Sequence, residues 1–110
     1  MTVDSFYRVE VFAPNELIIT RNCFGTKLFI LLKGRVQVEK VHKDGIVKVT
    51  SVMVNGACFG ERSLLFGARH ELSIRSLTFC ETSTLTQEQM KQVMKEFPAV
   101  EKNVRRRFVF

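Results

Sequence analysis

The residues with the clearest capacity for chemistry lie between Phe59 and Ile74, where a glycine precedes a short predicted helix. Gly60 lets the backbone come close to a ligand, and free N–H groups at the start of a helix can bind an anion. The carboxylate of Glu61 could accept hydrogen bonds from the hydroxyl groups of a sugar. Ten residues after Gly60, a polar corner leads into a new strand and would direct His70 at the same anion. The spacing therefore predicts a site for a molecule with an anionic group and sugar hydroxyls.

The rest of the sequence offers few other reactive groups. Two histidines and three cysteines lack the spacing of metal ligands, so we expect no metal site: His42, His70, Cys23, Cys58 and Cys80. No glycine-framed nucleophile and no pair of catalytic acids is visible, which argues against an enzyme. An odd number of cysteines without paired spacing favours reduced thiols in an intracellular protein. We therefore expect a binding module.

Length and composition indicate an ordinary globular protein. The chain has 110 residues, of which 45% are hydrophobic and 25% charged, and we expect one domain, 1–110. No apolar run approaches the roughly 20 residues that span a bilayer, and no signal peptide is visible. The net charge of +6 permits an acidic partner: a phosphate ligand, nucleic acid or an anionic membrane face. Lys102 and Arg105–Arg107 carry much of this excess, in a pattern typical of a solvated helix face.

Short strands separated by turns are predicted for about 7–85. The nearly continuous apolar run 27–33 is consistent with a strand that is buried on both faces. Lys43-Asp44-Gly45 is a strong signal for a hairpin turn. The clearest predicted strands are 7–12, 16–20, 27–33, 36–41 and 46–52. Strands at this spacing indicate a small β-barrel or jelly roll.

The hydrophobic period changes after the strands, and helices are predicted for about 86–110. Thr86 followed three residues later by Gln89 is a capping box, and Leu85 with Met90 would form a hydrophobic staple. Pro98 ends this helix and can begin another. The second helix would carry an apolar stripe at Val100, Val104 and Phe108. The predicted fold is therefore mainly β with C-terminal helices.

Several of these segments together resemble cyclic nucleotide-binding domains, in the order in which that family has them. Phe59-Gly60-Glu61 with Leu64-Leu65 is similar to the first half of the family's phosphate-binding cassette. The other similar segments are Val11–Ile19, Gly25, Lys27–Ile30, Gly34–Val38, Ser73–Arg75, Thr78–Cys80 and Glu96–Pro98. The details are most similar to the hyperpolarisation-activated and cyclic-nucleotide-gated channel branch. The resemblance covers Tyr7–Phe108 and implies an eight-stranded β-roll, or jelly roll, whose C-terminal helices form a hinge and lid.

The resemblance implies a role for each residue of the cassette. The backbone N–H groups of Gly60, Arg62 and Ser63 would donate to the cyclic phosphate of cAMP or cGMP. Glu61 would accept a hydrogen bond from the ribose 2′-OH. His70 stands where the family has the arginine that holds the phosphate. Apart from this ligand, no cofactor is implied.

Three consecutive residues depart from the family pattern at the phosphate position. Histidine is mostly neutral at pH 7, so His70 in place of arginine costs roughly 1.5–3 kcal/mol, or about 10- to 100-fold in affinity. Glu71 places a negative charge beside the phosphate, and Leu72 is larger than the usual alanine. Arg69 could replace the missing charge only if the corner bulges, because neighbouring side chains of a strand point to opposite faces. Alternatively, Glu71 pairs with Arg69 or Arg75 and closes the site.

Two functions stay open at this point. The first is a regulatory module that binds cAMP or cGMP, weakly or atypically, and transmits occupancy through its C-terminal helices. The alternative is a binding-incompetent homology domain that acts as a protein–protein or channel-assembly module. A nucleic-acid binder is disfavoured, because no helix-turn-helix and no basic face with interleaved aromatics is present. We expect an intracellular domain that works with a longer parent chain or protein partner, at a membrane protein's cytoplasmic face or free, without direct membrane insertion.

Overall fold

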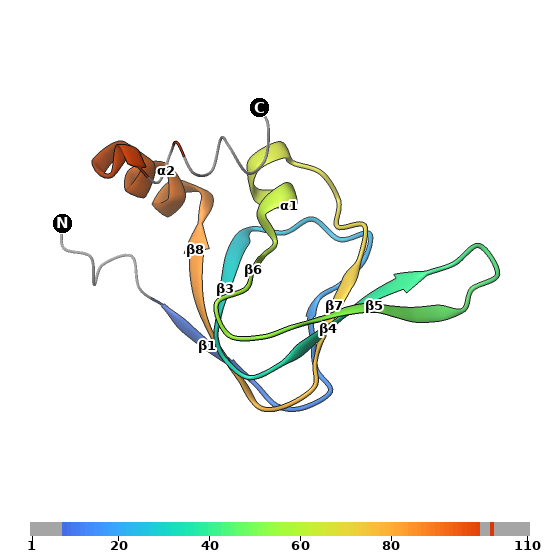
Figure 1. The fold of residues 1–110 in the computed structure, drawn as a ribbon. Helices are drawn as coiled ribbons and strands as arrows, with labels where there is room; N and C mark the ends of the chain where they lie inside the picture. Colours follow the sequence, from blue (N-terminus) through green and yellow to red (C-terminus); the bar gives the residue numbers. More distant parts are fainter. Residues whose placement is uncertain (1–7, 100–101, 103–110) are drawn as a thin grey trace.

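Two antiparallel sheets of four strands each form the body of the computed structural model, which describes residues 8–99 and 102 (Figure 1). The first sheet has the order β1 (Val9–Phe12), β8 (Cys80–Thr86), β3 (Lys27–Lys33) and β6 (Cys58–Phe59). The second has the order β2 (Leu17–Ile19), β7 (Ser73–Ser76), β4 (Val36–Val41) and β5 (Val47–Met53). Helix α1 (Glu61–Phe66) connects the two sheets, and helix α2 (Gln87–Glu96) follows β8. The predicted eight-stranded β-roll with a C-terminal helix is thus confirmed.

The core lies between the two sheets. Phe29 of β3 stacks on Phe59 of β6 with ring centroids 5.5 Å apart, and Leu31 is completely buried. The buried cluster contains Ile19, Phe29, Leu31, Val36, Val38, Phe59, Ile74 and Cys80. The prediction that 27–33 is buried on both faces is right only for its first part, because Leu32 is 36% exposed. The short β6 pairs only with Phe29 and Ile30, so the last residues of β3 extend beyond this neighbouring strand.

Strand β1 lies at the edge of the first sheet, and its two faces alternate as predicted. The valine face is the open one, since Val9 and Val11 are 47% and 51% exposed. Glu10 and Phe12 are half-buried, Glu10 pairs with Lys27, and the Phe12 ring meets the Phe29 ring edge-on. The polar residue of this strand therefore anchors β3.

The β4–β5 hairpin projects from the body of the molecule (Figure 1). Its turn is the predicted one: Gly45 has a φ of 84°, which favours glycine, and the Asp44 carboxylate accepts from the Ile46 N–H at 3.0 Å. Nearer the body, the Glu39 carboxylate accepts from Arg75 of β7 at 2.9 Å. Burial raises the pKa of Glu39, but the hydrogen bonds from Arg75 and Gln37 and the charge of Arg75 bring it below its ordinary value. This pair ties the base of the hairpin to the sheet.

Helix α2 begins with the predicted capping box. The Thr86 hydroxyl accepts from the Gln89 N–H at 3.2 Å, and the Gln89 side chain accepts from the Thr86 N–H at 2.9 Å. Leu85 packs against the cluster that contains Met90, as expected of a hydrophobic staple. Pro98, Ala99 and Lys102 are helical, while the predicted stripe of Val100, Val104 and Phe108 lies outside the described residues. Among the helices of the described part, none is long and apolar enough to cross a membrane.

Candidate functional site

A cavity of about 330 Å³ lies where β6 runs into α1, beside the corner before β7. It brings together six of the eight residues that the sequence predicted for the site: Gly60, Glu61, Arg62, His70, Glu71 and Leu72. Its remaining lining is mostly apolar and comes from both sheets: Ile19, Val38, Met53, Cys58, Phe59 and Ile74. The cavity thus has a polar side at the cassette and an apolar side at the sheets.

Gly60 holds the backbone close to β3 at the mouth of this cavity. Its φ is 90°, and a Cβ at this position would lie 2.8 Å from the Lys27 carbonyl oxygen. Both the conformation and the lack of space exclude a larger residue. Gly60 is the N-cap of α1 and, having no side chain, forms no capping hydrogen bond. The chain turns at this glycine directly from β6 into the helix.

Glu61 presents a carboxylate with unmet hydrogen-bonding capacity. Its Oε2 atom is buried and has no hydrogen-bond partner among the described residues. An unsatisfied buried polar atom costs about 1–3 kcal/mol. A carboxylate oxygen only accepts hydrogen bonds, so a hydroxyl or N–H group of a ligand would recover this cost once the side chain turns to expose the covered oxygen to the cavity.

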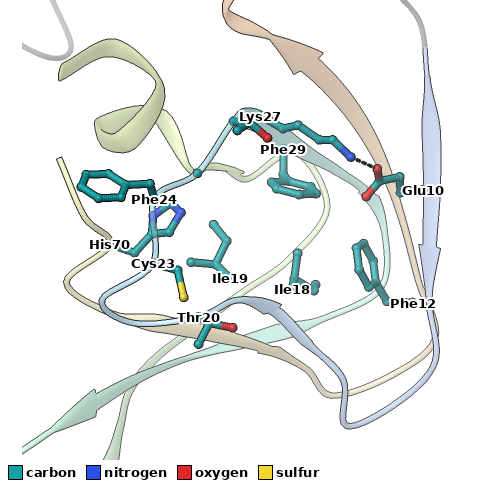
Figure 2. Close-up of a pocket in the computed structure, with 12 residues that line it drawn as sticks. Glu10, Phe12, Ile18, Ile19, Thr20, Cys23, Phe24, Lys27, Phe29 and His70 are labelled. Atoms are coloured by element: carbon teal, nitrogen blue, oxygen red, sulfur yellow. Dashed lines mark hydrogen bonds and ion pairs between the residues drawn. The ribbon is translucent and has the colours of Figure 1, made fainter. Parts of the chain in front are cut away.

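His70 lines this cavity and also a second one of about 320 Å³, which Figure 2 shows. Its backbone is fixed by the loop that follows β2, because its N–H donates to the Cys23 carbonyl at 2.9 Å and its carbonyl accepts from Asn22. Its imidazole packs against Gly25, where a Cβ would come within 2.5 Å of Nε2. Burial lowers the pKa of His70, and the nearby charge of Glu61 opposes this only in part. The imidazole is therefore neutral at pH 7.

Glu71 forms an ion pair with Arg62 of α1, with 3.6 Å between Oε2 and the guanidinium nitrogen. The expected pairing with Arg69 or Arg75 is absent from the described structure, since Arg75 is held by Glu39. Both partners are mostly exposed, at 65% and 71% of their side-chain surface, so this pair contributes little to stability. The pair nevertheless places the guanidinium of Arg62 beside the Glu71 carboxylate, which neutralises its charge.

The other two predicted residues, Ser63 and Arg69, do not line the cavity. The buried Ser63 hydroxyl bonds both backbone groups of Gly25, which joins α1 to the β2–β3 loop. Arg69 donates to the Asn22 carbonyl at 2.9 Å, and its guanidinium lies 4.6 Å from the centre of the Phe24 ring. The Arg69 side chain is therefore held at the β2–β3 loop and is not part of the cavity lining.

Sequence reasoning missed the apolar side of the cavity. Val38 and Met53 come from adjacent strands of the second sheet and line the same cavity as the cassette. The alternating valines of 36–41 were a usable signal, because one face of such a strand must be covered. Gly25 was identified only as part of the family resemblance, although it packs against the imidazole of His70.

Comparison with known proteins shows which family this chain belongs to. Residues 9–97 match the family model described as "Cyclic nucleotide-binding domain". The chain is 32% identical over 92 residues to the human potassium/sodium hyperpolarization-activated cyclic nucleotide-gated channel 4, covering 83% of this chain and 7% of the channel. It is 29% identical over 101 residues to the human cyclic nucleotide-gated channel alpha-2, covering 86% of this chain and 15% of that channel.

A solved structure with the same fold is the Thermus thermophilus catabolite activator protein. It superposes with a TM-score of 0.86 at 22% identity, over 91% of this chain and 47% of that one. The glycine–glutamate turn, the cavity beside it and the two-sheet roll occur together in a chain that the family model covers from β1 to the end of α2. The chain therefore belongs to the cyclic nucleotide-binding domain family.

Proposed function

We propose that this chain is a regulatory module that binds cAMP or cGMP in the 330 Å³ cavity and transmits occupancy through its C-terminal helices. The observation that carries the proposal is the unpartnered carboxylate oxygen of Glu61. It belongs to the residue that the family resemblance assigns to the ribose 2′-OH, and it lies beside the glycine that opens the backbone. A ribose hydroxyl is a suitable donor for it.

The phosphate would lie against the backbone N–H groups of Gly60, Arg62 and Ser63. The first N–H groups of a helix have no partner within that helix. With His70 neutral and Arg62 paired to Glu71, the site offers the phosphate no unpaired cation among the residues that line the cavity. We therefore expect affinity about 10- to 100-fold below that of a site with the arginine.

A packed contact offers a route from the cavity to the C-terminal helix. Leu64 of α1 and Met90 of α2 are both buried in one cluster with Leu28 of β3. A ligand that shifts α1 would therefore change the surface on which α2 rests. Such coupling is a population shift between two arrangements of α2.

The same proposal covers the surroundings of the module. Residues 1–110 act as one non-catalytic domain that needs no metal or cofactor besides the nucleotide. The chain spans only 15% and 7% of the two channel relatives, and by analogy it would work inside a longer intracellular protein. Its partners are then the rest of that chain or an associated protein, rather than nucleic acid or the membrane interior.

An NMR titration of the ¹⁵N-labelled chain with cAMP and then cGMP tests the proposal. We expect saturable shifts at Gly60, Glu61 and around His70. His70→Arg combined with Glu71→Thr should raise the affinity for cyclic nucleotides about 10- to 100-fold. The matched control is His42→Arg with Glu88→Thr, which makes the same charge change at exposed positions away from the cavity.

A second candidate function is a homology domain that no longer binds nucleotide and serves in protein or channel assembly. The Arg62–Glu71 pair at the cavity favours it, because it neutralises the one arginine of the lining. Unchanged spectra from folded protein, in both the parent and the His70→Arg/Glu71→Thr variant, would favour this alternative over nucleotide binding.

A further inference from the structure

The charges that line the cavity are poorly matched to an anionic ligand. Glu61 and Glu71 each carry a negative charge, and Arg62 compensates one of them. His70, the histidine of the lining, is kept neutral near pH 7 by its burial. The lining therefore has a net charge of about −1, although the whole chain carries +6. A cyclic phosphate would bring a second negative charge into this space.

The hydrogen-bonding groups of the two carboxylates are also poorly matched to an anionic ligand. Both carboxylates accept hydrogen bonds and donate none. The unesterified oxygens of a cyclic phosphate also only accept, whereas hydroxyl groups donate. Glu61 already has one buried oxygen without a hydrogen-bond partner among the described residues. The carboxylate side chains of the cavity are thus better satisfied by hydroxyls than by a phosphate, which only the backbone N–H groups of the cassette would favour.

The apolar side of the cavity has room and chemistry for a base. Val38 and Met53 of the second sheet and Leu72 of the corner contribute apolar side chains to the lining. Aliphatic walls of this kind suit the flat faces of a heteroaromatic ring, and about 330 Å³ is within the range of small-molecule sites. A free sugar would leave this side unfilled.

We infer that the cavity binds an uncharged ribonucleoside in preference to the corresponding cyclic nucleotide. This inference rests on the proposed function, because it uses the same cavity and the same ribose contact at Glu61. The nucleoside keeps the base and the 2′-OH, and it replaces the phosphate with 3′- and 5′-hydroxyls. These hydroxyls can donate toward Glu61 and Glu71.

Isothermal titration calorimetry at about pH 7.5 compares guanosine and adenosine with cGMP and cAMP on the whole chain. We expect each nucleoside to bind at least about tenfold more tightly than its cyclic nucleotide. 2′-Deoxyguanosine should bind at least about tenfold more weakly than guanosine, because it lacks the hydroxyl that Glu61 accepts from. Ribose alone should bind weakly. Ribose binding as tight as guanosine would overturn the inference by assigning the site to free sugars.

Variants of the lining test the physical reason. His70→Arg with Glu71→Thr should reverse the order, so that the cyclic nucleotide binds more tightly than the nucleoside. Glu61→Gln should weaken the binding of guanosine about tenfold or more, whereas the exposed control Glu88→Gln should leave this affinity unchanged. ¹⁵N spectra of each variant establish that it is folded before it is titrated.

The outcomes separate this inference from the proposed function. Cyclic nucleotides that bind as tightly as nucleosides, or more tightly, overturn the nucleoside preference and leave the regulatory site in place. No binding of either class, by a folded parent chain and a folded double variant, overturns both. Nucleoside binding that Glu61→Gln leaves unchanged would place the ligand elsewhere and overturn the inference.

Discussion

The behaviour of His70 depends on where its imidazole lies. It lines two cavities, one of them shown in Figure 2, and packs against Gly25, so it is partly removed from water. Burial lowers the pKa of His70, and Glu61 raises it by a smaller amount. An imidazole in this position offers an anion a positive charge only after it binds a proton. The residue therefore makes anion binding sensitive to pH in a way that arginine does not.

We predict that the affinity for cAMP rises as the pH falls through the lowered pKa of His70. Calorimetry from about pH 8 to about pH 5.5 should show a gain of about tenfold in the parent chain. The profile should be nearly flat in His70→Arg. His42→Gln, which removes the only other histidine, should keep the gain. An equal gain in His70→Gln would show that another group is responsible.

The stability of the unliganded fold should respond to pH in the opposite direction. Because the folded-state pKa of His70 is lowered, the contribution of the neutral imidazole is fully present above the ordinary value of about 6.5. It is lost as the pH falls through the folded-state pKa. Acid therefore weakens the fold while it strengthens anion binding, and a bound anion would partly offset the loss.

At the scale of the elements, α2 is held by its cap and by one apolar face. The capping box at Thr86 satisfies one backbone N–H of the helix, and Met90 and Met94 pack against Leu28 and Leu64. Beyond them, Lys95 and Glu96 are exposed, and Phe97 is 43% exposed. The helix thus rests on α1 and β3 through two methionines, so a shift of α1 would change the surface that holds it.

We predict that Thr86→Ala destabilises the fold by about 1 kcal/mol, because the Gln89 N–H loses its acceptor. Urea denaturation monitored by circular dichroism measures the free energy of unfolding. Gln87→Ala, at the exposed next position, is the control and should change it by less than about 0.5 kcal/mol. Equal effects of the two substitutions would contradict a stabilising role for the Thr86 cap of α2.

At the scale of the whole molecule, the two sheets are joined by a small shared core. β3 is central to it, because it pairs with both β6 and β8 and sends Phe29 and Leu31 inward. The projecting β4–β5 hairpin adds little to this core, since most of β5 is exposed. The stability of the roll therefore depends on a few side chains near the site.

We predict that Leu31→Ala costs about 2–5 kcal/mol, because it leaves a cavity at a fully buried position. A domain of this size has a free energy of unfolding of about 5–15 kcal/mol, so the variant should melt at a clearly lower temperature. Leu32→Ala, the next residue along β3, is 36% exposed and should cost well under half as much. Similar melting temperatures for the two variants would contradict the assignment of the core.

The sequence by itself determined the features that depend on neighbouring residues. Alternating and continuous apolar runs predicted the strands, Asp44-Gly45 predicted the hairpin turn, and Thr86 with Gln89 predicted the start of α2. Such signals are local, since a turn, a cap or a period of two is set within a few residues. The glycine before Glu61 was identified for the same reason, and its φ of 90° agrees.

Only the tertiary structure decided the partners and the surroundings of the site residues. Glu71 pairs with Arg62 instead of Arg69 or Arg75, and Glu39 holds Arg75 from another strand. The Glu39–Arg75 pair follows from the register of β4 and β7, and the Glu71–Arg62 pair from the packing of α1 beside the corner before β7. The neutral state of His70 likewise depends on packing against Gly25, which is 45 residues earlier in the chain. Burial and charge arise from such long-range contacts, so the cassette residues of the cavity were visible in the sequence, but its apolar lining and its electrostatics were not.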